Sequence, residues 1–185
     1  MQNDLAFLQY RSPFKAICAA GILVVFSFFS CSAVSADQSL SKEQKLKAAY
    51  LWNFTQYIQW PGSVVGRKPF LVRICVDGSI DFLHFLQEMV DSKSKFKGQN
   101  TVEAVPLDIA TGCELLFVSG TKKIEPVPLG HVVIVADSPS VNFPNTAVVF
   151  YQNNRKLRFE INMSVIKELD VVISSELLKL ARIKQ

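Results

Sequence analysis

The sequence is poor in the residues with which most enzymes and metal proteins do their chemistry. It has two histidines, His84 and His131, which stand far apart in the chain. It contains no GxSxG, HExxH, CxxC, Walker loop or GxGxxG pattern. A zinc site needs three or four clustered ligands, which these histidines do not provide. We therefore expect no catalytic residues, no metal site and no cofactor, and we do not predict an enzyme.

Long apolar runs are also scarce, and the prominent one lies near the N-terminus. Residues 16–29, AICAAGILVVFSFF, form an apolar run of 14 residues, whereas a membrane-spanning helix needs about 20. Arg11 and Lys15 precede the run, and the small residue Ala36 stands shortly after it. This order predicts a signal peptide over residues 1–36, cleaved after Ala36, and hence export. An uncleaved N-terminal anchor is the alternative.

The four cysteines are divided between the two parts of the chain. Cys18 and Cys31 lie in the predicted signal peptide, and lipidation of Cys31 is possible in principle, although residues 28–30 match a lipobox poorly. Cys75 and Cys113 remain after cleavage. Two cysteines in an exported protein are more often bridged than free, so we expect a disulfide between them. Two buried thiols are the alternative.

The exported part carries little net charge of either sign. Removing the signal peptide leaves 20 − 2 = 18 basic and 16 − 1 = 15 acidic residues, a net charge of +3. This charge and the lack of a Lys/Arg cluster argue against nucleic-acid binding. Residues 37–185 suit one domain with a single hydrophobic core. No second apolar stretch reaches about 18 residues, so we expect a soluble mature protein.

Two helices are predicted in the first half of the domain. Ser41 and Gln44 resemble a capping box at the start of a helix that runs through Trp60. Its predicted apolar stripe comprises Leu46, Ala49, Tyr50, Asn53, Phe54, Tyr57 and Ile58. Two interpretations of the aromatic residues of this helix are open: they pack in the core, or some of them line a groove for a ligand or partner. A second helix is predicted over residues 81–92.

The remaining pattern predicts an α/β fold. Strands are expected over residues 70–76, 101–107, 113–119, 131–136, 147–151 and 156–162, with a hairpin turn at residues 152–155. Several of these runs are apolar at every position, which is typical of strands covered on both faces. We therefore predict a single-domain, three-layer α/β/α sandwich with a mostly buried central sheet of about six strands.

Residues 157–183 close this unit. After the last predicted strand we expect a helical turn or two over residues 164–169 and a short apolar run over 171–173. A final helix capped by Ser174 or Ser175 is predicted to carry an apolar stripe that extends to Ile183.

The last predicted strand has one apolar and one polar face. Arg158, Glu160 and Asn162 alternate with apolar residues and share the polar face. Arg158 and Glu160 could pair with each other or with a covering helix. Alternatively they form a small polar site, in which Arg158 holds a carboxylate or phosphate and Glu160 holds an amine beside a stacking aromatic ring.

Four blocks of this sequence resemble, in order, those of the YfiR-like family. They are KAAYLWNFTQYIQWP (47–61), RICVDG (73–78), GCELLFVS (112–119), and LRFEIN with ISSELLKLA (157–162 and 173–181). The resemblance implies an α/β/α sandwich and a small periplasmic protein, often a homodimer. It implies a regulator that represses a membrane-anchored, YfiN-like diguanylate cyclase and so controls cyclic-di-GMP and biofilm formation. A YfiB-like outer-membrane protein would release the repression by sequestering the regulator.

The same resemblance assigns roles to individual residues. It implies that Cys75 and Cys113 form a disulfide, and that a pocket for a small aromatic ligand involves Phe54, Tyr57, Arg158 and Glu160. Asn145-Thr146 stands where many members have Gly-Gly, and the second cysteine pair of the best-known member is absent. An alternative function is a periplasmic small-molecule-binding module that signals to another membrane receptor, such as a histidine kinase.

Overall fold

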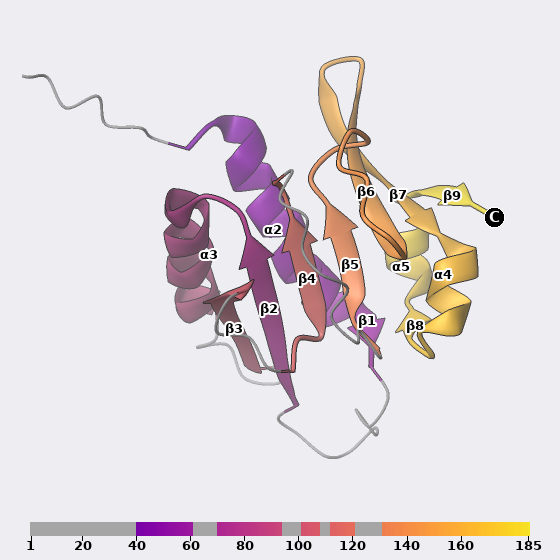
Figure 1. Cartoon of the computed structure of the whole chain (residues 1–185), viewed down its shortest axis with the longest axis horizontal. Coiled ribbons are helices and arrows are strands. Elements are labelled where there is room, and N and C mark those ends of the chain that lie inside the picture. The colour runs from indigo at the N-terminus through magenta and orange to yellow at the C-terminus, as the bar shows by residue number, and fades with distance from the viewer. Residues whose placement is uncertain (1–39, 61–69, 94–100, 108–111, 121–130) are drawn as a thin grey trace, which may run out of the picture. The chain divides into compact units, whose positions relative to one another are not determined.

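The computed structural model describes residues 40–60, 70–93, 101–107, 112–120 and 131–185 (Figure 1). All of these residues belong to one compact unit. Residues 1–39, which include the predicted signal peptide over residues 1–36, and residues 61–69, 94–100, 108–111 and 121–130 lie outside the described residues. The predicted α/β class, with a central sheet flanked by helices, is confirmed, and the main sheet has seven strands rather than about six.

Helix α2 (Lys42–Tyr57) begins at the predicted capping box, in which Ser41 and Gln44 exchange hydrogen bonds. It ends earlier than predicted, because the chain turns into strand β1 (Ile58–Gln59) before Trp60. The predicted apolar stripe is wrong in part. Leu46 and Tyr57 are 44% and 43% exposed, whereas the buried residues of the helix are Lys47, Ala48, Leu51, Trp52, Phe54 and Thr55. Helix α3 (Ile80–Lys93) agrees closely with its prediction.

The main sheet is ordered β3-β2-β4-β5-β6-β7-β9. Its strands are β2 (Leu71–Asp77), β3 (Thr101–Pro106), β4 (Leu115–Val118), β5 (Val133–Ala136), β6 (Thr146–Asn153), β7 (Lys156–Asn162) and β9 (Arg182–Lys184). All neighbouring pairs are parallel except the β6–β7 hairpin. Strands β4 and β5 are buried at every position, which explains their continuously apolar sequences.

The sheet separates two apolar clusters. The larger cluster contains the buried apolar residues of α2, α3, α4 and α5 together with alternate strand residues such as Ile74 and Phe159. The smaller cluster contains residues of opposite parity, Cys75, Leu116, Val118 and Ile134. The described residues that pack against this smaller cluster come from strand ends and loops. Among the described residues, helices therefore cover one face, and shorter segments cover β2, β4 and β5 on the other.

Left-handed backbone conformations occur in the predicted hairpin turn and at Asn145, which stands where many members of the resembled family have glycine. Asn154 and Arg155 have φ of 49° and 60° and form the predicted turn between β6 and β7. Asn145 has φ of 55° just before β6. Asparagine tolerates this region better than most residues, so Asn145 adopts a conformation of the kind that glycine favours.

The C-terminal segment differs most from expectation. Helix α4 (Met163–Glu168) begins at Asn162, whose side chain accepts from the Ser164 amide. Strand β8 (Val172–Ile173) pairs with β1 in a small second sheet. Helix α5 (Ser175–Leu178) is capped by Ser174 but is a single turn, and Ile183 belongs to β9 rather than to the helix. The chain therefore ends by adding a seventh strand to the main sheet, parallel to β7.

Candidate functional site

Two of the sequence-predicted site residues, Phe54 and Tyr57, lie on α2. Phe54 is fully buried, and its ring lies 6.0 Å from that of Phe150 and 5.2 Å from that of Phe159, measured between centroids. Aromatic pairs at these distances are typical of a packed core. Phe54 therefore joins α2 to β6 and β7 and presents no surface to a ligand, whereas Tyr57 is exposed near the end of α2.

A shallow hollow of about 160 Å³ lies where α2 meets α5. It is lined by Tyr50, Asn53, Tyr57, Glu176, Leu177 and Leu180. Two phenol rings, two leucines, an amide and a carboxylate combine apolar contact with a few polar groups, which suits an aromatic side chain or small amphipathic molecule.

The other two predicted site residues, Arg158 and Glu160, lie on the opposite face of the sheet. On β7, Phe159 and Ile161 belong to the helix-side cluster, so Arg158 and Glu160 point away from it. Glu160 is half-buried and forms an ion pair with Arg182 of β9. Arg158 is exposed.

Glu160 also borders a second hollow, with a volume of about 250 Å³. Its lining combines the loop before β6 with the far face of β6, β7 and β9, and comprises Pro139, Val141, Asn142, Phe143, Thr146, Ala147, Val149, Glu160, Asn162 and Lys184. The carboxylate of Glu160, which is paired with Arg182, and the ammonium of Lys184 lie here beside amide, hydroxyl and apolar side chains. This arrangement suits a small zwitterionic or amphipathic molecule, whose cationic part would share Glu160 with Arg182.

The structure therefore does not bring the four predicted residues together. The sheet separates Phe54 and Tyr57 from Arg158 and Glu160. Sequence reasoning missed Arg182 and Lys184, because it placed the C-terminal residues near Ile183 in a helix. The alternation of Arg182, Ile183 and Lys184 was the available signal for a strand.

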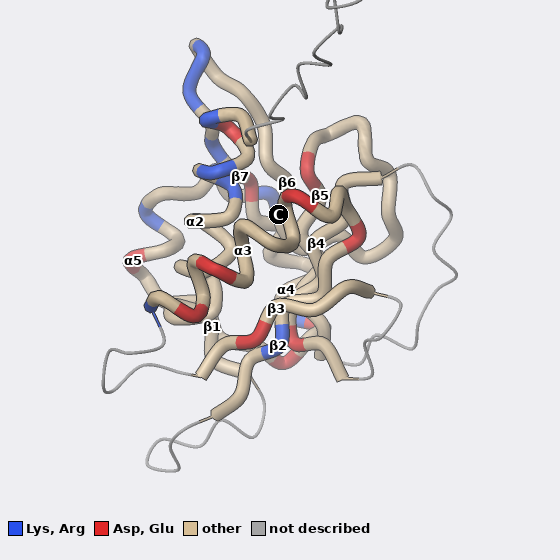
Figure 2. The backbone as a smooth tube through the Cα atoms, turned by 90° about the vertical axis from the view of Figure 1, so that its left-hand side faces the viewer, with Lys and Arg blue, Asp and Glu red and all other residues tan. Residues whose placement is uncertain are grey.

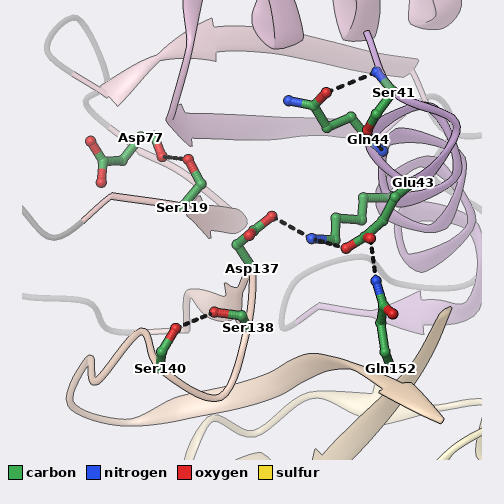
Figure 3. A network of polar contacts seen from close by, with 10 residues as sticks. Ser41, Glu43, Gln44, Asp77, Ser119, Asp137, Ser138, Ser140 and Gln152 are labelled. Carbon is green, nitrogen blue, oxygen red and sulfur yellow. Dashed lines mark hydrogen bonds and ion pairs between the residues drawn. The ribbon is translucent and has the colours of Figure 1, made fainter. Parts of the chain in front are cut away.

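A buried lysine organises the polar contacts where α2 crosses the carboxyl end of β5 (Figure 3). Lys47 is 5% exposed, and its Nζ lies 2.8 Å from both Glu43 Oε1 and Asp137 Oδ1. Gln152 of β6 donates to Glu43. The hydrogen bond from Lys47 holds the pKa of Glu43 below its ordinary value, while partial burial opposes this effect. This network ties α2 to β5 and β6.

The carboxyl ends of β2 and β4 also approach each other closely (Figure 3). Ser119 Oγ donates to the Asp77 carbonyl oxygen over 2.9 Å. A Cβ at Gly78 would lie 2.8 Å from Ser119 Oγ, so glycine allows this approach. Asp77 Oδ2 is the buried side-chain oxygen that lacks a hydrogen-bond partner in the described part of the chain.

The predicted disulfide is present between Cys75 and Cys113. Their Cα atoms are 5.9 Å apart, a distance that suits a bridge. Nearby, the Arg73 amide donates to Glu114 over 2.6 Å and the Trp60 indole donates to the Glu114 carbonyl over 3.0 Å. Burial raises the pKa of the Glu114 carboxyl above its ordinary value, and the bond from Arg73 partly offsets this. The bridge and these bonds join the segment before β4 to β2.

A sequence model of the YfiR/HmsC-like family matches residues 44–182, from α2 to β9. The chain belongs to the YfiR/HmsC-like family. This family is regulatory rather than catalytic, and it is periplasmic. A comparison with curated proteins finds no match.

The helices in the described part of this YfiR/HmsC-like chain include none that is long and apolar enough to cross a membrane. Within the same residues, no group of three or more His, Cys, Asp or Glu side chains is arranged to hold a metal ion.

Proposed function

We propose that this chain is an exported regulator that binds the periplasmic region of a membrane-anchored, YfiN-like diguanylate cyclase and holds it inactive. The observation that carries the proposal is the family match over residues 44–182, which spans the described fold from its first helix to its last strand. The family's regulatory and periplasmic character supports this role. Repression would lower cyclic-di-GMP and biofilm formation.

The proposal also covers how the repression is relieved and how the regulator assembles. A YfiB-like outer-membrane protein would relieve the repression by sequestering the regulator, and the regulator would act as a homodimer. Sedimentation of the purified mature domain, residues 37–185, checks the dimer. A mass that stays monomeric over the accessible concentration range contradicts it.

The first test is genetic. Deleting the gene should raise cellular cyclic-di-GMP, and a plasmid copy should restore it to the starting level. Unchanged cyclic-di-GMP after deletion contradicts the proposed repression. Capture of the tagged mature protein from membranes, followed by identification of what accompanies it, should recover a diguanylate cyclase. Recovery of a histidine kinase instead supports the alternative function.

That alternative is a small-molecule-binding module that signals to another receptor. It is favoured by the hollow of about 250 Å³ beside Glu160. Phe54 is buried and would support such a site only through packing. Tyr57 would contact a ligand in the separate hollow between α2 and α5.

Calorimetric titration with aromatic amino acids, nucleotides and pyridoxal compounds tests this alternative. Two variants distinguish the hollows, because Glu160→Gln changes only the first and Tyr57→Ala only the second. We expect binding of a zwitterionic aromatic compound that Glu160→Gln weakens and Tyr57→Ala leaves unchanged. The absence of binding for all three classes of compound argues against the module.

A further inference from the structure

Basic residues gather at the end of the β6–β7 hairpin, where the backbone in Figure 2 is largely blue. Arg155 lies in the turn, and Lys156 and Arg158 follow on β7. All three residues are exposed. The ion pairs of the described residues involve Lys47, Arg73 and Arg182, so the three hairpin cations have no carboxylate partner within that part of the chain.

An aromatic residue lies among these cations. Tyr151 is the cross-strand partner of Arg158, so their side chains share the face that points away from the helices. The guanidinium of Arg182 lies over the Tyr151 ring, 4.1 Å from its centroid. Tyrosine and arginine are the residue types that dominate the binding energy of protein interfaces. We call Tyr151, Arg155, Lys156, Arg158 and Arg182 the basic hairpin face.

Nothing within the described residues covers this face. The pairing of β5 with β6 ends at Val149, so the rest of the hairpin extends past β5 (Figure 1). The apolar cluster on this side of the sheet contains residues of β2, β4 and β5 but none of β6, β7 or β9. No other element of the described residues therefore covers the basic hairpin face.

The backbone at the turn adds an independent observation. Arg155 has φ of 60°, a conformation that is unfavourable for residues other than glycine and asparagine. The second position of such a turn usually carries glycine. Residues in such conformations cluster at functional sites, and an exposed arginine at this position can contact an anionic group.

We infer that the basic hairpin face docks an acidic surface of the protein that this chain regulates, which rests on the proposed function. Complementary charge accelerates and orients association. A membrane surface fits less well, because none of the exposed large apolar side chains lies on the hairpin to insert between lipids. The basic clusters that bind anionic lipids also typically lie beside a transmembrane helix or on an amphipathic helix, whereas these residues lie on a β-hairpin and on the neighbouring strand β9.

The test compares matched charge reversals in a strain that lacks the chromosomal copy. Lys156→Glu/Arg158→Glu reverses two charges on the basic hairpin face. Lys42→Glu/Lys167→Glu reverses two exposed charges on α2 and α4. The full-length proteins are expressed at the lowest level at which the wild type represses. Cyclic-di-GMP and the amount of cyclase captured from membranes are measured.

We expect the hairpin variant to reduce the amount of captured cyclase by roughly tenfold or more. Cyclic-di-GMP should then stay at the level of the deletion strain. The control variant should behave like the wild type. Equal melting temperatures and an intact disulfide would show that both variants are folded. Undiminished capture and repression by the hairpin variant overturn the inference while leaving the proposed function intact. If the wild type itself neither captures a cyclase nor lowers cyclic-di-GMP, the proposed function fails, and the inference fails with it.

Flotation with phosphatidylglycerol vesicles, compared with phosphatidylcholine vesicles, separates a protein partner from a lipid surface. We expect the purified wild type to float with neither. Binding to phosphatidylglycerol alone, lost in the hairpin variant, would assign the face to lipid headgroups and overturn the protein-docking inference.

Discussion

Lys47 is buried in the fold, although lysine side chains usually lie at the protein surface. It stands among charged residues at the start of α2, yet its side chain lies between Glu43 and Asp137. A buried ammonium ion is tolerated because both contacts are charge-assisted. Asp137 is 90 positions away in sequence, so the local pattern carried no sign of this pairing.

Replacing Lys47 by methionine should destabilise the fold. The side chain keeps its approximate volume, but the two carboxylates lose their shared cation. We expect a loss of about 2–3 kcal/mol in the free energy of unfolding, below the full cost of a buried unpaired charge because the carboxylates can regain water. Urea denaturation measures the change. Lys42→Met, at an exposed position of the same helix, should change it by less than about 0.5 kcal/mol, and an equal loss in both variants would count against the network.

Glu43 should make stability depend on pH. Its folded-state pKa is lowered, first by the hydrogen bond from Lys47, so the unfolded state binds the proton more readily. The stabilisation is therefore complete above the unfolded-state pKa and is lost as pH falls through the folded-state pKa. The stability difference between wild type and Glu43→Gln should be largest at neutral pH and shrink in acid. A difference that is constant down to strongly acidic pH would refute this account.

At the scale of single elements, periodicity located the helices and strands better than it oriented them. The stripe predicted on α2 was real as a pattern, but α2 packs against α3 and α5 as well as against β6 and β7 of the main sheet. Which residues are buried therefore depends on three neighbours, and Leu46 and Tyr57 remain exposed. The helix capped by Ser174 was predicted but made too long, and the edge strand β9 was missed, because a few residues carry too little periodicity to separate helix from strand.

The β6–β7 turn offers a prediction at this scale. Arg155 adopts φ of 60°, where glycine has no steric penalty. Arg155→Gly should therefore raise the free energy of unfolding by roughly 0.5–1 kcal/mol. Thermal and urea unfolding measure it. Arg155→Ala is the matched control, since it removes the same side chain but keeps the Cβ, and it should not stabilise. Equal effects of both changes would show that the turn is not strained.

At the scale of the whole molecule, the disulfide joins β2 to the segment before β4, which are distant from each other in the sequence. Cys75 and Cys113 are 38 positions apart, and helix α3 and strand β3 lie between them. The bridge limits the freedom of the unfolded chain over this loop. It thereby stabilises the folded arrangement, in which β2 pairs with both β3 and β4.

Removing the bridge should cost stability without changing the fold. The Cys75→Ala/Cys113→Ala variant should lose about 4 kcal/mol in the free energy of unfolding by the chain-entropy model. Denaturation of the wild type in the presence of a reductant should approach the same value. Mass spectrometry of the non-reduced exported protein should find the two cysteine-containing peptides linked. Two alkylatable thiols in that protein would contradict the bridge.

The sequence by itself determined the fold class, the two long helices, six of the strands, the hairpin turn and the cysteine pair. Each of these depends on local periodicity, on turn chemistry, or on the small number of cysteines outside the predicted signal peptide. The tertiary structure decided which residues can act together. Strand alternation places Arg158 and Glu160 on the face opposite Phe54. Pairing of β9 with β7 supplies Arg182 as the partner of Glu160. Such contacts join residues that are distant in sequence, and they form only when the strands are laid side by side.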